Sequence, residues 1–372
     1  MNKELITRRE AAAMRGLAIL AIVLHNYTHW LGPMVKENEY TFSWHNVERL
    51  FAELSHPSWD IIAHLFSFFG HYGVPVFVFL SAYGLVMKYE GGRQCAGEPR
   101  KPVKEEGAWT FVKKHFMKLW IMMAVGYSAF VLVDYMTPGH YRYTFWNVVG
   151  QLGMFSNLYD DQDHAIWPGP YWYFGLTMQL YLVYRFVLYP GKASLSGHIS
   201  KKMRLLVPVV LAVGCIAVQL SFEPLSAELN WFRYNCMGNL PVFALGIIYA
   251  RTMERTEKPR LLEAPWAISA LALVAVFCVD FVFWTFAPFF VCIGTIKLVR
   301  ALPGTLLRPL AWTGGISAAM FVCHPITRKV IIPISRHGEI YAGLLLYILA
   351  TIIAAILFKK AIEIVSESIN KS

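Results

Sequence analysis

Long apolar runs separated by short polar segments repeat from Ala12 almost to the end of the chain. About twenty apolar residues in a helix cross the hydrocarbon core of a bilayer. That length divides the chain into ten runs, and only "VDFVFWTF" (279–286) separates the seventh from the eighth. The pattern predicts an all-α fold, a polytopic membrane helical bundle of about ten transmembrane helices. The predicted spans are 12–31, 65–87, 115–136, 170–189, 205–222, 237–250, 265–281, 284–299, 309–331 and 340–358.

Composition supports a membrane protein. The chain is 56% hydrophobic and only 16% charged, whereas soluble domains carry about 25% charged residues. No change in composition divides the 372 residues, so we expect one transmembrane domain over 1–372. No cleavage site follows the first apolar run, which argues against a removable signal peptide. The stretch 146–158 is too short and polar to span, and we expect a half-helix at the surface there.

Charge predicts the orientation. With ten spans, 26 Lys and Arg residues fall on the side of the N-terminus and seven on the other side, with Arg15 inside a span. Lys and Arg accumulate in cytoplasmic loops, so both termini are predicted to be cytoplasmic. The net charge of +10 then reflects topology, and we expect no nucleic-acid partner.

Common catalytic and metal-binding motifs are missing from the sequence. There is no C-x-x-C pair, P-loop, G-x-G-x-x-G or G-x-S-x-G, and no metal site is predicted. The acidic run 160–163 can bind a cation or a sugar, but a solvated loop is the favoured interpretation. A haem needs facing histidines on two helices at matching depth, and only His25 and His324 lie mid-span. A haem or quinone redox protein is therefore a weaker alternative.

The first predicted span carries three ionisable residues, Arg15, His25 and His29, where burial of charge is costly. Ten residues at 1.5 Å each place His25 about 15 Å deeper than Arg15. Arg15 can reach phosphate at the inner surface, while a neutral imidazole near mid-bilayer suits a general base. This arrangement fits a reaction whose donor enters from the cytoplasm.

Four stretches in the same order resemble the acyltransferase family 3 membrane proteins, which O-acylate glycans with cytoplasmic acyl-CoA. The third keeps Trp172, Gln179 and Tyr181, and the fourth keeps Gly315, Ser317 and His324. Together with the predicted spans, the resemblance covers nearly the whole chain. The stretches are "MRGLAILAIVLH" (14–25), "YGVPVFVFLSAYG" (72–84), "WYFGLTMQLY" (172–181) and "WTGGISAAMFVCHPI" (312–326).

The resemblance implies an O-acyltransferase of the plasma (inner) membrane that moves an acyl group from acyl-CoA to a hydroxyl of a cell-envelope glycan. The expected acyl group is acetyl, and the expected donor is acetyl-CoA. Its expected partners are acyl-CoA, that acceptor and membrane lipids. His25 would act as the base or carry the acyl group, and Arg15 would hold a CoA phosphate. The expected CoA-binding residues are Lys113, Lys114, His115 and Lys118, and the expected substrate-binding residues are Ser81, Trp172, Gln179, Tyr181 and His324.

The sequence also departs from the family pattern. Nine residues separate Arg15 from His25 instead of ten, which turns His25 about 80° away from the face of Arg15. Either a π-bulge turns His25 back to the face of Arg15, or His29 shares its role as the base. The depth of His25 in the membrane favours His25. The cytoplasmic arginine pair of the family is His115 and Lys118 here, and lysine lacks the bidentate fork of arginine.

Structural roles and other functions stay open for these motifs. The glycines can allow close helix packing, the aromatic residues of 172–181 can form an interfacial belt, and the lysines near 113–118 can be topology charge. A transporter or flippase of a glycan or lipid-linked sugar is the alternative function, because ionisable residues inside membranes also mark translocation paths.

Overall fold

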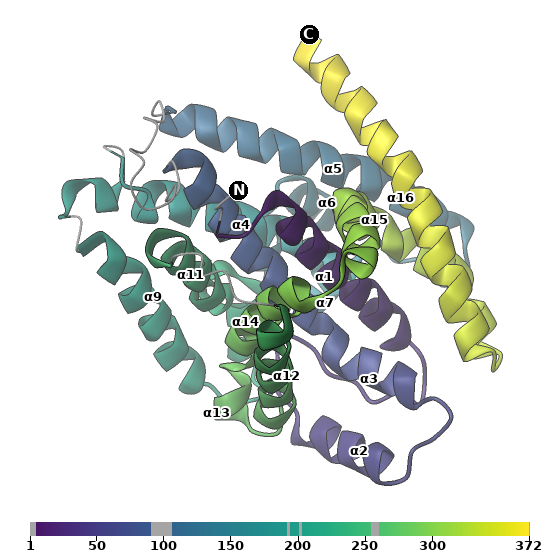
Figure 1. Cartoon of the computed structure of the whole chain (residues 1–372). Coiled ribbons are helices and arrows are strands. Elements are labelled where there is room, and N and C mark those ends of the chain that lie inside the picture. The colour runs from purple at the N-terminus through teal and green to yellow at the C-terminus, as the bar shows by residue number, and fades with distance from the viewer. Residues whose placement is uncertain (1–4, 91–105, 192–193, 201–202, 254–259, 372) are drawn as a thin grey trace.

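The computed structural model describes residues 5–90, 106–191, 194–200, 203–253 and 260–371. These residues form helices, and none of them lies in a β-strand, so the predicted helical class is confirmed (Figure 1). The main helices are α1 (Arg8–Thr28), α3 (Ile61–Phe69), α4 (Gly73–Tyr89), α5 (Ala108–Met136), α8 (Trp172–Val183), α9 (Met203–Leu220), α11 (Cys236–Thr252), α12 (Arg260–Phe277), α14 (Ala287–Ala301), α15 (Gly304–Arg336) and α16 (Ile340–Lys371). The shorter ones are α2 (Trp44–Ser55), α6 (Phe145–Leu152), α7 (Gln162–Ala165), α10 (Ala227–Tyr234), α13 (Phe281–Trp284) and the single turns η1 (Gly70–Tyr72), η2 (Ser156–Leu158), η3 (Gly169–Tyr171), η4 (Tyr184–Leu188) and η5 (Leu195–His198).

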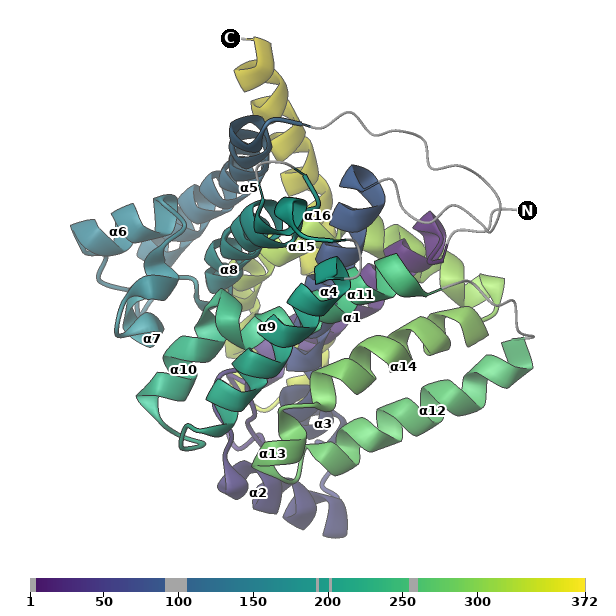
Figure 2. The same cartoon turned by 90° about the vertical axis from the view of Figure 1, so that its left-hand side faces the viewer.

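Helical structure lies in each of the ten predicted spans. In the described part of the chain, six helical segments are long and apolar enough to cross a membrane. Shorter helices occupy the other four ranges, and two of these, α12 and α14, lie side by side (Figure 2). The six segments are Arg8–Thr28, Ile61–Tyr89, Ala108–Met136, Met203–Leu220, Gly304–Arg336 and Ile340–Ile369.

Helix α1 lies at the centre of the bundle and packs against α15, α3, α4 and α14. It meets α15 backbone to backbone: a Cβ added to Gly16 would lie 1.9 Å from the Leu310 carbonyl oxygen, and one added to Gly314 would lie 1.8 Å from that of Ala12. Only glycine permits this approach from both sides. The two glycines therefore set the register between α1 and α15.

The outer helices expose apolar side chains, as lipid-facing helices do. Val210 on α9, Ile268 on α12 and Ile353 on α16 are all exposed. The predicted half-helix at 146–158 is α6 followed by the turn η2, with Trp146 exposed.

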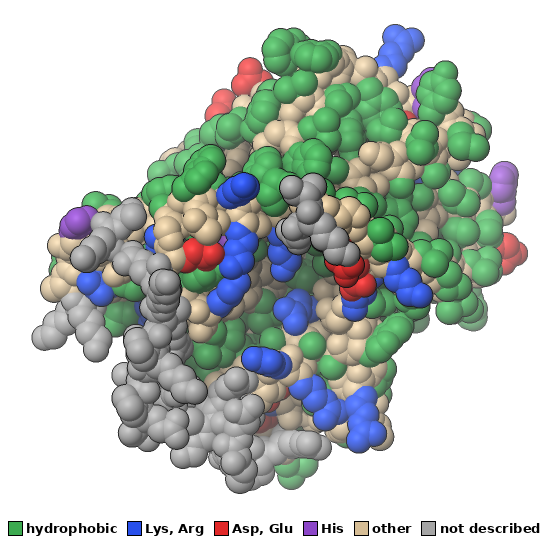
Figure 3. All heavy atoms as spheres, turned by 90° about the horizontal axis from the view of Figure 1, so that it is seen from above, with side chains coloured by type: hydrophobic (Ala, Val, Ile, Leu, Met, Phe, Trp, Pro, Cys, Tyr) green, Lys and Arg blue, Asp and Glu red, His purple; other side chains and the backbone are tan. Residues whose placement is uncertain are grey.

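Helix α1 begins, and α16 ends, on the same side of the bundle (Figures 1 and 2). Seen from that side, Lys and Arg side chains surround a hollow in the surface (Figure 3). We refer to this side as the basic face, and it is where α4 ends and α5 begins.

Candidate active site

A cavity of about 300 Å³ lies beside the second half of α1, away from the basic face. We call it the polar chamber, because charged and polar side chains share its wall with aromatic ones. Its polar lining residues are His25, Asn26, His29, Asn38, Glu39, Asp163 and Arg328. Its aromatic lining residues are Trp30, Tyr40, Trp167, Trp172, Tyr173 and Phe321.

A backbone carbonyl holds His25 in one tautomer. The His25 Nδ1 lies 2.9 Å from the carbonyl oxygen of Ser67 on α3. A carbonyl oxygen only accepts, so Nδ1 carries the proton and Nε2 keeps its lone pair. The segment that carries Ser67 can approach α1 so closely because Gly70 faces His25: a Cβ at Gly70 would lie 2.6 Å from the His25 Cβ. A neutral imidazole with a free Nε2 can accept a proton in the polar chamber.

Two further imidazoles surround His25. Its ring centroid lies 5.0 Å from that of His29 and 5.6 Å from that of His71. Helix α1 is regular from Arg8 to Thr28, so the π-bulge that would have turned His25 back toward the face of Arg15 is not formed. Instead, His25 and His29 both line the chamber.

The loop after α1 brings carboxyl groups to the site. The Glu39 Oε2 lies 3.9 Å from the His71 Nδ1, and the Arg233 Nε donates to the Glu39 carbonyl oxygen over 2.7 Å. Burial raises the pKa of Glu39 to about 7 and that of Glu37, in the same loop, to about 8. Both groups therefore titrate close to neutral pH.

Aromatic rings form the far wall of the polar chamber. Tyr40 and Tyr234 stack with centroids 3.9 Å apart, and Trp172 packs edge-on against both. The Tyr234 hydroxyl donates to the Asp163 carboxylate over 2.8 Å. Aromatic faces beside hydrogen-bonding groups suit a ligand with apolar and polar sides, such as a sugar.

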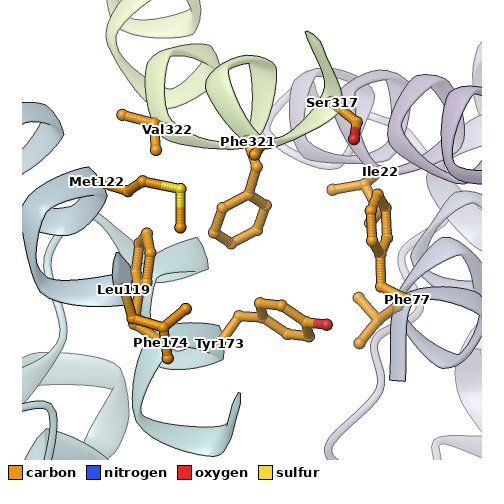
Figure 4. A pocket seen from close by; sticks show the side chains of 11 residues that line it. Ile22, Phe77, Leu119, Met122, Tyr173, Phe174, Ser317, Phe321 and Val322 are labelled. Carbon is orange, nitrogen blue, oxygen red and sulfur yellow. The ribbon is translucent and has the colours of Figure 1, made fainter. Parts of the chain in front are cut away.

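A second cavity of about 100 Å³, which we call the apolar chamber, adjoins the polar one. The two share Ile22, Val74, Tyr173 and Phe321. Figure 4 shows apolar side chains from α1, α4, α5, α8 and α15 around a common space. Among its lining side chains, only Ser317 and Tyr173 carry a polar atom.

A basic cluster of Lys88, Lys114, His115 and Lys118 lies on the basic face, where α4 ends and α5 begins. The His115 Nε2 lies 3.0 Å from the Tyr89 hydroxyl, and Lys114 pairs with Glu106 over 3.2 Å. The next residues along α5, Leu119 and Met122, line the apolar chamber. Basic cluster, apolar chamber and polar chamber thus follow one another across the bundle.

The structure brings several of the predicted site residues together. Tyr181 hydrogen-bonds Ser81, and its ring centroid lies 4.5 Å from that of His115. Trp172 lines the polar chamber with His25. Arg15, half-buried on α1, lines neither chamber, and its Nε has no hydrogen-bond partner among the described residues. Lys113 is exposed beside the basic cluster.

Gln179 and His324 lie apart from both chambers. The Gln179 amide donates to Asn235 and accepts from the Cys236 backbone N–H, each over 2.8 Å, and so ties α8 to the start of α11. The His324 Nδ1 lies 2.8 Å from the Phe321 carbonyl oxygen, which Pro325 leaves without its helical partner because proline has no N–H. These contacts give both side chains a structural task; their predicted contact with substrate stays a prediction.

The sequence analysis missed the three charged side chains of the polar chamber, Glu39, Asp163 and Arg328. Asp163 was interpreted as part of a solvated run, and Glu39 lies in a loop whose fold the pattern does not specify. Arg328 had a usable signal, since it falls inside the predicted span 309–331. In the described residues, no group of three or more His, Cys, Asp and Glu could hold a metal ion.

The site is thus a polar chamber inside an apolar helical bundle, lined by a histidine held in one tautomer, with a basic face on one side of the bundle (Figure 3). The family model described as an acyltransferase domain, acyltransferase family 3, matches residues 10–359, and the chain belongs to this family. It is a multi-pass membrane acyltransferase. The match favours acyl transfer over the transporter or flippase alternative. No curated protein and no solved structure matches the chain.

Proposed function

We propose that this acyltransferase moves an acetyl group from cytoplasmic acetyl-CoA to a hydroxyl of a cell-envelope glycan, with His25 as the base. The observation that carries the proposal is the hydrogen bond from the His25 Nδ1–H to the Ser67 carbonyl. It leaves Nε2 as the basic atom in a chamber that adjoins an apolar passage toward a basic face.

The donor enters from the basic face. The phosphates of CoA bind the basic cluster, with Lys113 and Arg15 contributing further charge, since ammonium and guanidinium groups bind phosphate through charge-assisted hydrogen bonds. The uncharged arm of CoA extends through the apolar chamber, where it buries apolar surface. The thioester thereby reaches the level of His25, about 15 Å from Arg15 along α1.

The acceptor occupies the polar chamber, with a sugar ring against Trp172 and Tyr40 and its hydroxyls near Asp163. His25 Nε2 takes the proton of the attacking hydroxyl while its oxygen bonds to the thioester carbonyl carbon. The tetrahedral intermediate then expels the CoA sulfur, which receives that proton from the imidazolium. The products are an O-acetylated acceptor and CoA with a free thiol.

This proposed arrangement places the donor and the acceptor on opposite sides of the membrane. The basic face is cytoplasmic and both termini lie there, in the plasma (inner) membrane, while the polar chamber opens on the opposite side. Acetyl groups therefore cross the membrane through the protein.

The test uses purified protein in sealed vesicles, with acetyl-CoA and a glycan acceptor on opposite sides. We expect acetylated acceptor, and mass spectrometry of envelope glycans from deletion and wild-type strains identifies the modified hydroxyl and the acyl mass. Product formed only when donor and acceptor share the cytoplasmic side would overturn the crossing. Movement of acceptor without acyl transfer would support the flippase instead.

A further inference from the structure

A buried arginine faces the polar chamber without a carboxylate partner. Arg328 lies on α15, three residues after Pro325, and only 7% of it is exposed. Its Nη1 donates to the Asn26 carbonyl oxygen over 3.1 Å, and the guanidinium lies 4.9 Å from the centroid of the Trp30 ring. These two contacts hold the side chain against the end of α1, where it lines the chamber together with His25.

Several other cations in the described residues pair with carboxylates. Arg251 pairs with Glu90 over 2.8 Å, Lys297 with Glu263 over 2.6 Å, and Lys329, the next residue in the chain, with Asp134. Within the described part of the chain, no carboxylate forms an ion pair with Arg328. A buried charge without a counter-charge is costly, so a negatively charged group is expected to occupy the space in front of it.

The position of Arg328 beside the base indicates which negative charge this is. Arg328 binds the backbone of Asn26, the residue that follows His25, and it lines the same chamber as His25 and His29. Attack of a hydroxyl on a thioester places one new negative charge on the carbonyl oxygen, within reach of the group that removes the proton. A guanidinium has five N–H donors, and the bond to Asn26 uses one of them.

An anionic acceptor is a poorer explanation for the same cation. Asp163 and Glu39 line the chamber as well, and the Asp163 carboxylate, together with Glu39 above its pKa of about 7, would repel a carboxylate or phosphate on the acceptor. Asp163 receives a hydrogen bond from Tyr234, and Glu39 faces His71, so neither carboxyl is engaged by Arg328.

We propose that Arg328 is a catalytic residue that donates hydrogen bonds to the thioester carbonyl oxygen and stabilises the oxyanion formed when the acceptor hydroxyl attacks. The charge forms as the carbon–oxygen bond to the acceptor is made and disappears as the carbon–sulfur bond breaks. This assignment rests on the proposed function, because it requires a thioester beside His25.

The experiment compares purified wild type with Arg328→Gln and Arg328→Lys in two reactions, hydrolysis of acetyl-CoA without acceptor and transfer to a glycan acceptor. Loss of one oxyanion donor lowers kcat by about 10²- to 10³-fold. We expect Arg328→Gln to lower kcat of both reactions by the same factor, with both KM values nearly unchanged. Arg328→Lys, which keeps the charge, should recover part of the rate.

Two controls separate this role from a structural one. Arg336→Gln removes an exposed cation on the same helix that contacts the Trp30 carbonyl, and it should leave both rates unchanged. Ethyl-CoA lacks the carbonyl oxygen, so wild type and Arg328→Gln should bind it equally. Weaker binding of ethyl-CoA by Arg328→Gln, or a rate loss that the Lys variant does not recover in a folded protein, would assign Arg328 to structure.

The remaining outcomes are also distinct. A raised acceptor KM with unchanged hydrolysis would overturn the oxyanion role in favour of an anionic acceptor. Unchanged kinetics would show that Arg328 takes no part in the reaction. Wild-type protein that neither hydrolyses nor transfers from acyl-CoA would refute the proposed function, and the assignment of Arg328 with it.

Discussion

The two chambers share four lining residues and the same central helix, yet their walls differ in kind. The apolar chamber is closed by side chains such as Phe77, Leu119 and Met122, which interact with a ligand mainly by dispersion. The polar chamber concentrates His25, Glu39 and Arg328, where charge and hydrogen bonding act in an enclosed volume. In the proposed function this contrast separates passage from chemistry: the apolar chamber admits the arm of CoA, and the polar chamber holds the reacting groups.

The proposed contrast between the two chambers depends most strongly on His25, the base of the polar chamber. Removing the base from the polar chamber by His25→Ala should lower transfer by about 10²- to 10⁴-fold, the contribution of a positioned general base. The measurement is acetyl transfer by purified protein of unchanged yield and thermal stability.

His29→Ala is the matched control, because His29 lines the same chamber without the bond to Ser67. It should be milder. An inactive His29→Ala with an active His25→Ala would show that the helical face, and not the held tautomer, selects the base.

The basic face provides the second test. A charge-assisted hydrogen bond contributes about 1.5 to 3 kcal/mol, so Arg15→Ala should raise the KM for acetyl-CoA about tenfold or more. Arg9→Ala removes an exposed arginine from the first turn of α1 and should change it little. Lowered kcat at constant donor KM would instead make Arg15 a positioning residue for His25.

At the apolar chamber, kcat/KM should depend only on the volume of the side chains that line it. Ala318 lines it, and Ala318→Leu adds three carbons to a space of about 100 Å³, where overpacking is unfavourable. We expect kcat/KM to fall several-fold with acetyl-CoA and by a similar factor with butyryl-CoA, because the arm of CoA is common to both donors, while Ala318→Gly leaves both values near wild type. A clearly greater loss with butyryl-CoA would place the acyl chain, and not the arm of CoA, in this chamber.

The smallest expected effect is a change in the stability of the protein, caused by substitution of Glu37 in the loop beside the polar chamber. The pKa of Glu37 is raised from 4.5 to about 8 by burial, so between these pH values the unfolded chain holds fewer protons than the folded one. The free energy of unfolding then falls as pH rises, by up to about 1.4 kcal/mol per pH unit. Glu37→Gln should remove this dependence and raise the melting temperature at pH 8 but not at pH 4.5.

The exposed Glu48 on α2 supplies the control for that measurement. Glu48→Gln should leave the pH dependence of melting as it is in wild type. If Glu37→Gln melts below wild type at pH 8, the carboxylate is charged and stabilising there.

Much of the architecture was predictable because its signals are local. A run of about twenty apolar residues predicts a helix wherever it packs, and helices lie in all ten predicted ranges. The shorter helices α8, α11, α12 and α14 show where length alone stops being decisive: the structure identifies six segments long and apolar enough to span. The count of ten and the cytoplasmic termini stay predictions.

By itself, the sequence determined the helical class, the membrane setting and the family, since apolar length, motif order and residue spacing are all read along the chain. Only the tertiary structure decided what surrounds His25. The bond to Ser67, 42 residues away, and the approach of Arg328, 302 residues beyond Asn26, depend on how α3 and α15 pack against α1. That packing rests on glycines that meet backbone atoms from distant segments, and the distance between such groups follows from close packing in three dimensions.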